Sequence, residues 1–577
     1  MKTPARFIRH VLLLAAVAGF TLAGCRSKER DDRSGSVPMD AGRAEAFVDL
    51  RSIIADSLAT GAKEVVIPPG RYPLQAEQGS HLAFSGLTGV TIIADGVEIV
   101  CSSTVRALSF EACTDVTIRG LTVDYDPLPF TQGTITAMAP DKSWLEFEVV
   151  QGYPEHKLAG PFQIYDPSTK SLRRRDGRWS EEIASLGNGR YRVSKAAPYQ
   201  FDSVEDTERK GDILIAKNAF GKAGSPHAIE LRHCKNMRLE DITIFASPSF
   251  GYLERNCHGS TLLRCIVDRR DPGDDPIKRG LPRIRSLNAD AFHSKDASQG
   301  PAIISCKAHF MGDDAVNING RYHFVRGTNG REASIIIIDN FNTIRAGDTV
   351  EFLPYSGPNT DRAKVVRRQS DPEPLNEEEK AFIGRLRMDE RFRGELLGGK
   401  GELIKLTLDR EINLPPGSLV CCPDRVGNGF VIRDCDFGHN RSRGILIKAS
   451  NGEVSGNLIS HCRMAAILVS PEFWWMEAGL PSNLMIRKNI IKGCFETPIQ
   501  IHAFAGSRAV LPAGTLRNIS VIENRIEDST WPLIHVRSTS GLIIKDNLLP
   551  ASPPSNGRRN SKEAPQAILL ENCETTP

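Results

Sequence analysis

A short apolar pattern recurs along the chain, with several intervals close to 23 residues. Each copy consists of an apolar residue, two variable residues, often Asn or Cys, one variable residue and a second apolar residue. Copies begin at Ile118, Leu239, Leu262, Ile303, Ile432, Val454, Ile486, Val521 and Ile544. Alternation of apolar residues over such short runs indicates β-strands. A repeat of about 20–25 residues built from strands and turns indicates a solenoid.

The intervals between copies distinguish two kinds of solenoid. Leu239 and Leu262 are 23 residues apart, as are Val521 and Ile544, and the longer intervals indicate loops inserted between coils. Leucine-rich repeats have a similar length, but the regular leucine and asparagine signature of that fold is missing and helical segments between the strands are few. The sequence therefore predicts an all-β parallel β-helix.

Equivalent positions of successive copies carry the same residue types. One repeat position holds Cys265, Cys306 and Cys435, and also Asn457, Asn489, Asn524 and Asn547. Stacked coils lie about 4.8 Å apart, the spacing of paired strands. We therefore expect interior ladders, in which small thiols and asparagines contact their equivalents on neighbouring coils.

Interruptions of the repeat divide the chain into segments. Coils are expected over residues 41–126, 225–322 and 426–550, β-rich insertions over 127–224 and 323–425, and a Pro- and Ser-rich tail over 551–577. A helical stripe of apolar residues within Ala41–Ala59 predicts a helix that caps the open end of the solenoid and protects its first edge.

The two insertions have patterns of their own. The first shows strand-like alternation around Trp144–Val150 and Arg190–Val193. The second contains strand-like runs near Asp348–Phe352 and Leu403–Leu408, with a charged helical pattern over Glu377–Arg393. Because the insertions flank residues 290–314, we expect them either to form the walls of a cleft or to be structural additions alone.

The first 25 residues have the pattern of a secretory signal. Lys2, Arg6 and Arg9 precede the apolar run Val11–Phe20, and a Leu-Ala-Gly-Cys sequence ends at Cys25. This ending resembles the bacterial lipobox, which implies that Cys25 is lipidated, becomes the first mature residue and anchors the protein to a membrane. An ordinary signal peptide is the alternative.

The residues after Cys25 bear on where the anchor lies. Arg26 occupies the position at which the inner-membrane retention signal of such lipoproteins has Asp, so we expect the outer membrane of a bacterial cell envelope. Residues 26–40, rich in charge, Ser and Gly, are typical of a flexible tether. No later stretch approaches the roughly 20 apolar residues of a membrane-spanning helix.

Charge and cysteine content exclude several classes of function. With 73 Lys and Arg against 70 Asp and Glu, the net charge is +3, and no nucleic-acid footprint is present. The cysteines other than Cys25 are scattered through predicted strands without C-x-x-C pairs, which argues against a zinc site or a dense disulfide framework. No cofactor or metal is indicated. One or two disulfides and a homodimer remain open.

Three acidic residues lie at a distance that matches the repeat. Asp290 and Asp313 are 23 residues apart, and Asp314 follows directly. On consecutive coils, Asp290 and Asp313 would project to one face, while Gly312 indicates a bend at which Asp314 also faces solvent. Carboxylates held this close retain a proton, which supplies a general acid beside a general base. Glycoside hydrolysis uses such a pair.

Structural explanations compete with an acid–base site. Aspartates in β-solenoid turns often cap backbone amides, and stacked carboxylates bind Ca²⁺ in some proteins. The position of Asp290 one coil away from the Asp-Asp pair, with Asn288 and His293 beside it, favours a site.

The two acidic motifs resemble the signature of pectinase-fold glycosidases. These motifs are Asn-Ala-Asp-Ala-Phe-His at residues 288–293 and Gly-Asp-Asp-Ala-Val-Asn at residues 312–317. Polygalacturonases of glycoside hydrolase family 28 have Asn-Thr-Asp-Gly followed by an Asp-Asp pair. This chain departs from them at Ala291, which replaces the glycine, and it has only partial echoes of their Gly-His-Gly and Arg-Ile-Lys elements.

Glycoside hydrolase family 110, the α-1,3-galactosidases, provides a closer resemblance. The shared features are the 23-residue Asp spacing, the β insertions, the run Arg441–Ile447 and the Trp-Met-Glu-Ala-Gly sequence at residues 475–479. Family members more usually have Trp-x-Glu-Ser-Gly, so Ala478 is a departure. The resemblance extends over most of residues 41–550 and implies a right-handed parallel β-helix.

This resemblance also implies an activity, namely exo-acting, inverting and metal-independent hydrolysis of terminal α-1,3-linked galactose in a glycan. Asp290, Asp313 and Asp314 would be the catalytic carboxylates. By the polygalacturonase pattern, Asp313 protonates the glycosidic oxygen, whereas Asp290 and Asp314 activate the water. An inverting pair requires roughly 6.5–9.5 Å between its carboxyl groups.

Several further residues are candidates for substrate binding. Trp475, or its neighbour Trp474, would stack on a sugar face. Side chains that could form polar contacts with a sugar are His293, His323, Arg441, Arg443 and Glu477. Each also has a structural alternative, such as packing for the tryptophans and ion pairing with a neighbouring coil for Arg443.

Two other classes of function remain open. One is a different β-helix carbohydrate enzyme, either a polygalacturonase-like hydrolase or a polysaccharide lyase that depends on Ca²⁺. The other is a carbohydrate-binding solenoid without catalytic activity.

Overall fold

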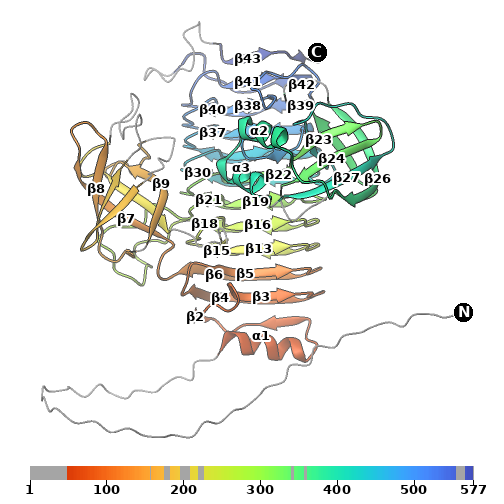
Figure 1. Cartoon of the computed structure of the whole chain (residues 1–577). Coiled ribbons are helices and arrows are strands. Elements are labelled where there is room, and N and C mark those ends of the chain that lie inside the picture. The colour runs from red at the N-terminus through yellow and green to blue at the C-terminus, as the bar shows by residue number, and fades with distance from the viewer. Residues whose placement is uncertain are drawn as a thin grey trace, which may run out of the picture. The chain divides into compact units, whose positions relative to one another are not determined.

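The computed structural model describes residues 49–155, 157–173, 182–194, 208–218, 226–338, 344–355, 360–399, 401–553 and 566–575. These residues form a stack of parallel coils (Figure 1). The predicted signal peptide with Cys25 and the predicted tether lie outside the described residues. Within the described part of the chain, no helix is long and apolar enough to cross a membrane.

Two parallel sheets form the walls of the solenoid. The larger sheet consists of β1 (Glu64–Val66), β2 (Gly70–Leu74), β4 (Thr91–Cys101), β6 (Thr117–Tyr125), β14 (Arg238–Glu240), β15 (Thr243–Ile244), β17 (Thr261–Leu263), β18 (Ile266–Val267), β20 (Ala302–Ile304), β21 (Lys307–His309), β29 (Val431–Arg433), β30 (Asp436–Gly438), β32 (Gly452–Ser455), β33 (Leu458–Ser460), β36 (Ser482–Arg487), β37 (Ile490–Lys492), β39 (Leu516–Ile522), β40 (Arg525–Glu527), β42 (Thr539–Lys545) and β44 (Glu574–Thr575).

The second sheet lies beside the first along the stack. It contains β3 (Ser80–Ser85), β5 (Arg106–Glu111), β13 (Ile229–Arg232), β16 (Tyr252–Arg255), β19 (Phe292–Lys295), β22 (Val316–Arg321), β31 (Ile445–Ile447), β34 (Ile467–Val469), β38 (Ile499–Ile501), β41 (Ile534–Arg537) and β43 (Ile568–Glu571), and β35 (Glu477–Ala478) pairs with β22. The predicted all-β parallel β-helix is confirmed.

A helix lies at the N-terminal end of the stack, as the apolar stripe predicted (Figure 1). This helix, α1, spans Leu50–Ala59 and is capped by Asp49, whose carboxylate accepts a hydrogen bond from the backbone N–H of Arg51. Leu50 and Ile54 are buried in the hydrophobic core, so the helix covers apolar surface of the first coils.

Equivalent positions of the sequence repeat pair with one another in the larger sheet. Leu239 pairs with Leu262, Leu262 with Ile303, and Ile303 with Ile432, although the second insertion lies between the last two. The third residue of each copy turns the chain between two short strands and adopts positive φ, for example 54° at Asp241. Loop length therefore leaves the register of the coils unchanged.

The predicted interior ladders are present. The Asn457 amide donates to Oδ1 of Asn489 at 2.9 Å, Asn489 donates to Asn524 at 2.9 Å, and Asn524 donates to Asn547 at 3.0 Å. In the cysteine ladder, the backbone N–H of Cys265 donates to Sγ of Cys306 at 3.4 Å. The cysteines in the described residues are free thiols, so no disulfide forms among them.

The first insertion is a six-stranded antiparallel sheet. In the order β10 (Glu182–Gly187), β11 (Arg190–Ser194), β8 (Trp144–Val149), β7 (Phe130–Met138), β12 (Ile213–Asn218) and β9 (Leu158–Tyr165), the strands enclose a separate small apolar core. Phe147 and Tyr191 stack in this core with ring centroids 5.4 Å apart.

The second insertion is a closed barrel with two helices. Its strands follow the order β23 (His323–Asn329), β24 (Glu332–Ile337), β27 (Glu402–Leu408), β26 (Asp361–Ser370), β25 (Thr349–Leu353) and β28 (Leu419–Cys421), and between β26 and β27 lie α2 (Glu377–Arg385) and α3 (Glu390–Leu397). The charged segment predicted as helical thus forms two helices. Closure leaves the barrel without exposed strand edges.

The prediction of a tail after residue 550 is wrong for its last part. Ile568 of β43 pairs with Ile534 of β41, and Glu574 of β44 pairs with Ser540 of β42, so the chain adds another coil. The Pro- and Ser-rich stretch obscured the short apolar run Ile568–Leu570, which continues the register.

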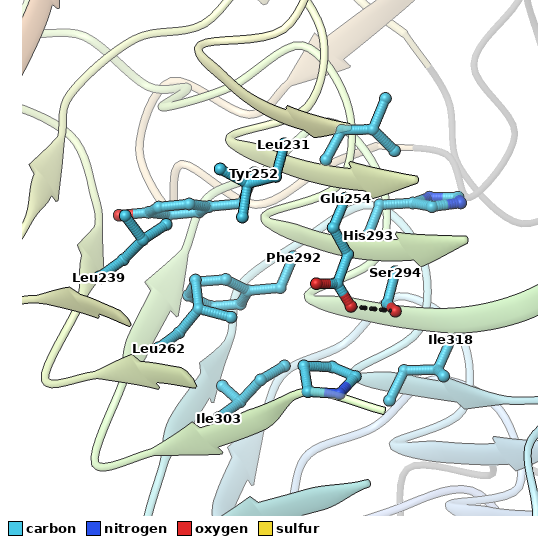
Figure 2. A pocket seen from close by; sticks show the side chains of 12 residues that line it. Leu231, Leu239, Tyr252, Glu254, Leu262, Phe292, His293, Ser294, Ile303 and Ile318 are labelled. Carbon is cyan, nitrogen blue, oxygen red and sulfur yellow. Dashed lines mark hydrogen bonds between the residues drawn. The ribbon is translucent and has the colours of Figure 1, made fainter. Parts of the chain in front are cut away.

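Apolar side chains such as Leu239, Leu262 and Ile303 line the interior of the coils (Figure 2). It holds a cavity of about 20 Å³, large enough for roughly one water. Beside this cavity, buried Glu254 accepts a hydrogen bond from the Ser294 hydroxyl, and burial raises the pKa of Glu254. The ring of His293 points away from Phe292, as strand alternation requires. The cavity therefore belongs to the core, whereas His293 faces the other side of its strand.

Candidate active site

The sheet register places Asp290 beside Asp314 instead of Asp313. Phe292 of β19 pairs with Val316 of β22, a step of 24 residues, and the backbone N–H of Asp314 points to Oδ1 of Asp290 at 3.4 Å. The expectation that Asp290 and Asp313 are equivalent is therefore wrong by one residue. On the next coil, Ala315 donates its N–H to the carbonyl of Arg443, which makes Arg443 the equivalent of Asp314.

The three predicted carboxylates nevertheless meet. Oxygens of Asp290, Asp313 and Asp314 all lie within 4.8 Å of one another. Asp290 and Asp314 are buried, whereas 33% of the Asp313 side chain is exposed. We call these three residues the acidic trio.

Burial and mutual repulsion favour retained protons on the trio. Burial raises the pKa of Asp290 well above its ordinary value of 3.8, and the charges of Asp313 and Glu477 raise it further. Burial also raises the pKa of Asp314 to about 8, although the Arg443 guanidinium opposes this shift. At neutral pH, protonated and ionised carboxyl groups therefore stand side by side, as general acid–base chemistry requires.

Two arginines of the predicted set contact the trio directly. Arg441 forms a 2.7 Å ion pair with Asp313 and donates to the carbonyl of Gly312 at 2.6 Å. The backbone N–H of Arg443 donates to Asp314 at 2.8 Å, and its guanidinium pairs with Glu472 at 2.6 Å. Both guanidinium groups thus hold carboxylates in place.

His293 is fixed in one protonation state by its neighbours. Its Nε2 lies 3.0 Å from the Asn319 amide nitrogen, which can only donate, so the proton of the neutral ring sits on Nδ1. Nδ1 then donates to Asp290 at 2.8 Å. Burial lowers the pKa of His293 to about 4, so the ring is neutral at physiological pH and orients Asp290.

Glu477 joins the same hydrogen-bond network from β35. It contacts the fully buried Lys448 at 2.9 Å and accepts a hydrogen bond from the Asn317 amide at 3.3 Å. Burial alone would raise the pKa of Glu477, but Lys448 and His293 hold it at about 2. Glu477 therefore remains ionised beside the trio.

The first insertion supports the turns that carry the trio. Gln163 of β9 donates to the carbonyl of Gly312 at 3.1 Å and accepts from Arg285 at 2.5 Å. Asn288 donates to the carbonyls of Pro129 and Pro248 at 2.9 and 3.1 Å. A Cβ on Gly312 would lie 2.6 Å from the Asn288 carbonyl oxygen, so a larger residue cannot be accommodated without movement.

The remaining predicted binding residues lie in two different places. Trp475 is half-buried and lines a surface cleft of about 550 Å³, together with Trp474 and Glu472. His323 begins the barrel, is 1% exposed and accepts the backbone N–H of Ile338 at 3.3 Å. Its burial places His323 in the framework of the barrel, out of reach of a sugar in this structure.

Some residues at the site were not found from sequence. Glu472 contacts both Arg443 and Lys448, which makes it a fifth carboxylate near the trio, and its place just before the tryptophan pair was the available signal. Gln163 lies in an insertion without a repeat, so no sequence pattern could have connected it with Gly312.

The spacing of the trio oxygens is also compatible with a cation in the described residues. However, the direct ion pair of Arg441 with Asp313 already supplies positive charge there. An acidic cluster alone does not define a metal site, and the raised pKa values fit proton transfer.

Known proteins show similarity over most of the chain. A family model described as a right-handed beta helix region matches residues 424–553. α-1,3-Galactosidase B of Bacteroides thetaiotaomicron is 22% identical over 89% of this chain and 84% of its own length. α-1,3-Galactosidase A of Bacteroides fragilis is 21% identical over 89% of this chain and 86% of its own length. The chain is a β-helix protein like those of glycoside hydrolase family 110.

Two solved structures show distant similarity to the chain. The A-module of a mannuronan C-5 epimerase from Azotobacter vinelandii covers 92% of both chains with a TM-score of 0.36 and 10% identity. The catalytic domain of a family 87 α-1,3-glucanase covers 91% of this chain and 71% of its own with a TM-score of 0.33 and 8% identity. These values carry no argument about function.

Proposed function

We propose that the chain is an exo-acting glycoside hydrolase that removes terminal α-1,3-linked galactose from glycans by metal-independent acid–base catalysis. The observation that carries this proposal is the acidic trio, whose oxygens lie within 4.8 Å of one another. The names and coverage of the relatives support glycosidase activity on galactose-containing glycans. Those names, together with the resemblance of residues 288–293, 312–317 and 475–479 to glycoside hydrolase family 110, support the α-1,3 linkage.

The proposed roles follow exposure and charge. Asp313 is the most exposed of the three carboxyl groups, so it is best placed to protonate the glycosidic oxygen. Arg441 forms an ion pair with Asp313. Of Asp290 and Asp314, which His293 and Arg443 orient, the carboxylate that is ionised would hold and deprotonate the water.

The stereochemical course has two candidates. The family resemblance favours inversion, in which water attacks directly. Retention, in which a carboxylate attacks the sugar first, is the alternative. NMR of the first sugar released from an α-galactoside distinguishes them, because inversion gives β-galactose and retention gives α-galactose.

A panel of α- and β-galactosides tests the activity. We expect release of galactose from terminal α-1,3-linked substrates, insensitivity to EDTA, and loss of turnover in Asp313→Asn with folding intact. Unsaturated product that disappears with EDTA would identify a lyase. Glycan binding without turnover on any substrate, unchanged in Asp290→Asn, would identify a binding solenoid. Either result overturns the proposal.

The sequence of residues 1–25 also carries a proposal about location. We propose lipid attachment at Cys25 and anchorage in the bacterial outer membrane. Cys25→Ala should abolish incorporation of labelled palmitate and release the protein from the membrane fraction. Labelling that persists in this variant would contradict the proposal.

A further inference from the structure

A surface cleft of about 550 Å³ is lined by Glu472, Trp474 and Trp475. Its volume falls within the roughly 300–1,000 Å³ of ligand-binding pockets. Glu472 lines the cleft and pairs with Arg443, whose backbone N–H holds Asp314. Arg443 therefore connects the cleft with the trio, because it contacts both Glu472 and Asp314.

Two arginines give this cleft a positive charge. Arg387, between α2 and α3, and Arg508, in the turn from Phe504 to Val510, both line it and are exposed. Among the described residues, neither guanidinium has an ion pair with a carboxylate. The one acidic residue in the lining, Glu472, is already paired with Arg443 and Lys448.

A single tyrosine holds the two arginine-bearing segments together. The Tyr355 hydroxyl accepts the backbone N–H of Arg387 at 3.0 Å, and its carbonyl accepts the N–H of Ser507 at 3.1 Å. Its ring packs so closely on Gly506 that a Cβ there would lie 2.2 Å from a ring carbon. The backbones of the two arginine-bearing segments are thus held together beside the cleft.

Aromatic side chains form the rest of a carbohydrate platform. Trp474 is 41% exposed in the cleft, and the guanidinium carbon of Arg387 lies 5.8 Å from the centroid of its ring. The Trp474 carbonyl accepts the backbone N–H of Asp389 at 3.0 Å, which ties the tryptophan loop to the second insertion. Phe504 lies in the same lining. An exposed indole beside exposed cations suits a sugar ring that carries an anionic substituent.

We infer that this cleft binds the sugar to which the terminal galactose is attached, and that it selects sugars bearing a sulfate or carboxylate group. Arg387 and Arg508 would bind the anion, and Trp474 would stack on the sugar ring. Guanidinium groups bind such planar or tetrahedral oxyanions through paired hydrogen bonds. The inference rests on the proposed function only for the identity of the terminal sugar.

Matched substrates test this inference. Three α-galactosides that differ only in the penultimate sugar (neutral, sulfated or uronic acid) are hydrolysed at low ionic strength. Wild-type protein should have a KM for at least one anionic substrate about tenfold or more below that for the neutral one, as expected for charge-assisted hydrogen bonds. Whichever anionic substrate shows the preference identifies the group that the cleft binds.

The arginine variants decide whether the cleft is responsible. Arg387→Gln and Arg508→Gln should each reduce the preference, and the double variant should abolish it, with the loss in KM. Arg385→Gln, at the end of α2 and outside the cleft, removes the same charge and should retain the preference. Equal KM values in wild-type protein, or a preference that survives the double variant, would overturn the inference.

A binding measurement separates this inference from the proposed function. If no galactoside is hydrolysed, the proposed function fails, and calorimetry with the neutral, sulfated and uronic acid glycans then tests the cleft alone. Binding of an anionic glycan that the double arginine variant loses and Arg385→Gln retains would support the cleft. Absence of such binding would overturn it. Hydrolysis of the galactosides without a preference for an anionic substrate would overturn only the inference about the cleft.

Discussion

Two columns of polar residues, built by the same coils, differ in composition. In the interior, Asn457, Asn489, Asn524 and Asn547 repeat one side chain, which donates to one neighbour and accepts from the other. On the site face, Asp290, Asp314 and Arg443 occupy equivalent positions with unlike charges. In a column of identical amides, each side chain supplies the hydrogen-bond partner that its neighbour needs. A buried column of charged groups instead depends on partners from other coils.

The comparison indicates how structural and functional positions differ in a solenoid. The asparagine can repeat on successive coils because each amide accepts a hydrogen bond from the amide on the preceding coil. Burial raises the pKa of Asp314 to about 8, and Arg443 beside it opposes this shift. Burial of ionisable groups in the site column therefore lowers the stability of the fold. A side chain that repeats on successive coils therefore indicates a stabilising position. A change of side chain within such a column indicates a candidate catalytic position. The following variants test this distinction.

The largest effect is expected at the trio. Asp290→Asn removes an ionisable carboxyl while keeping its shape, so kcat should fall by about 10²- to 10⁴-fold. Thermal unfolding should show a melting temperature no lower than that of wild-type protein, because a repelled buried carboxyl is lost. A variant that keeps most of its activity would remove Asp290 from the catalytic set.

In the asparagine ladder, we expect a loss of stability without a loss of activity. Asn489→Ala leaves the backbone N–H of Asn457 and the carbonyl of Val454 without their side-chain partner. Each such buried group costs about 1–3 kcal/mol of unfolding free energy, which denaturant titration measures. Turnover per folded molecule should be unchanged.

An exposed asparagine pair provides the matched control. Asn483 donates to Asn451 at 2.8 Å on the surface, where water can replace the bond. Asn483→Gly accommodates the positive φ of 56° and should cost far less than Asn489→Ala. Similar losses in both variants would show that burial does not determine the value of the ladder.

The pH dependence of stability is expected to be a smaller effect. Because the folded pKa of Asp314 is raised, its contribution to stability is full below 3.8 and is lost as pH rises through about 8. Asp314→Asn should therefore melt at a higher temperature than wild-type protein above pH 8, with the difference vanishing near pH 4. A difference that does not change with pH would show that ionisation of Asp314 is not its cause.

The smallest effect is expected at a surface ion pair. Arg487 contacts Glu453 at 2.8 Å across two coils, and both side chains are partly exposed. Arg487→Gln should change the unfolding free energy by about 0–1 kcal/mol and leave activity unchanged. A loss as large as that in Asn489→Ala would show that the outer face stabilises the coils as much as the interior.

The fold was predictable because its signal is local and repeated. The apolar residues identified at Leu239, Leu262 and Ile303 pair directly, and the Asn and Cys positions form the expected ladders. The acidic trio was also predictable as a cluster, because the length of a coil converts sequence distance into contact. Its catalytic roles remain predictions.

What could not be predicted depends on single residues or on contacts between unrelated segments. The step from Phe292 to Val316 is 24 residues, and this one-residue difference exchanges Asp313 for Asp314 beside Asp290. The support of Gly312 by Gln163 crosses 149 residues and has no periodicity. The last coil was missed because its apolar run is short and follows a Pro- and Ser-rich stretch.

The barrel between β22 and β29 also delays the pairing of neighbouring coils while the chain is being synthesised. Cys306 and Cys435 are adjacent in the cysteine ladder but 129 residues apart in the chain. At about 5–20 residues per second, the edge formed by β20 and β21 waits on the order of 10 s for its neighbour to leave the ribosome. During that interval the growing chain exposes an unpaired strand edge, and the barrel closes only near its end, because its last strand, β28, directly precedes β29 in the chain.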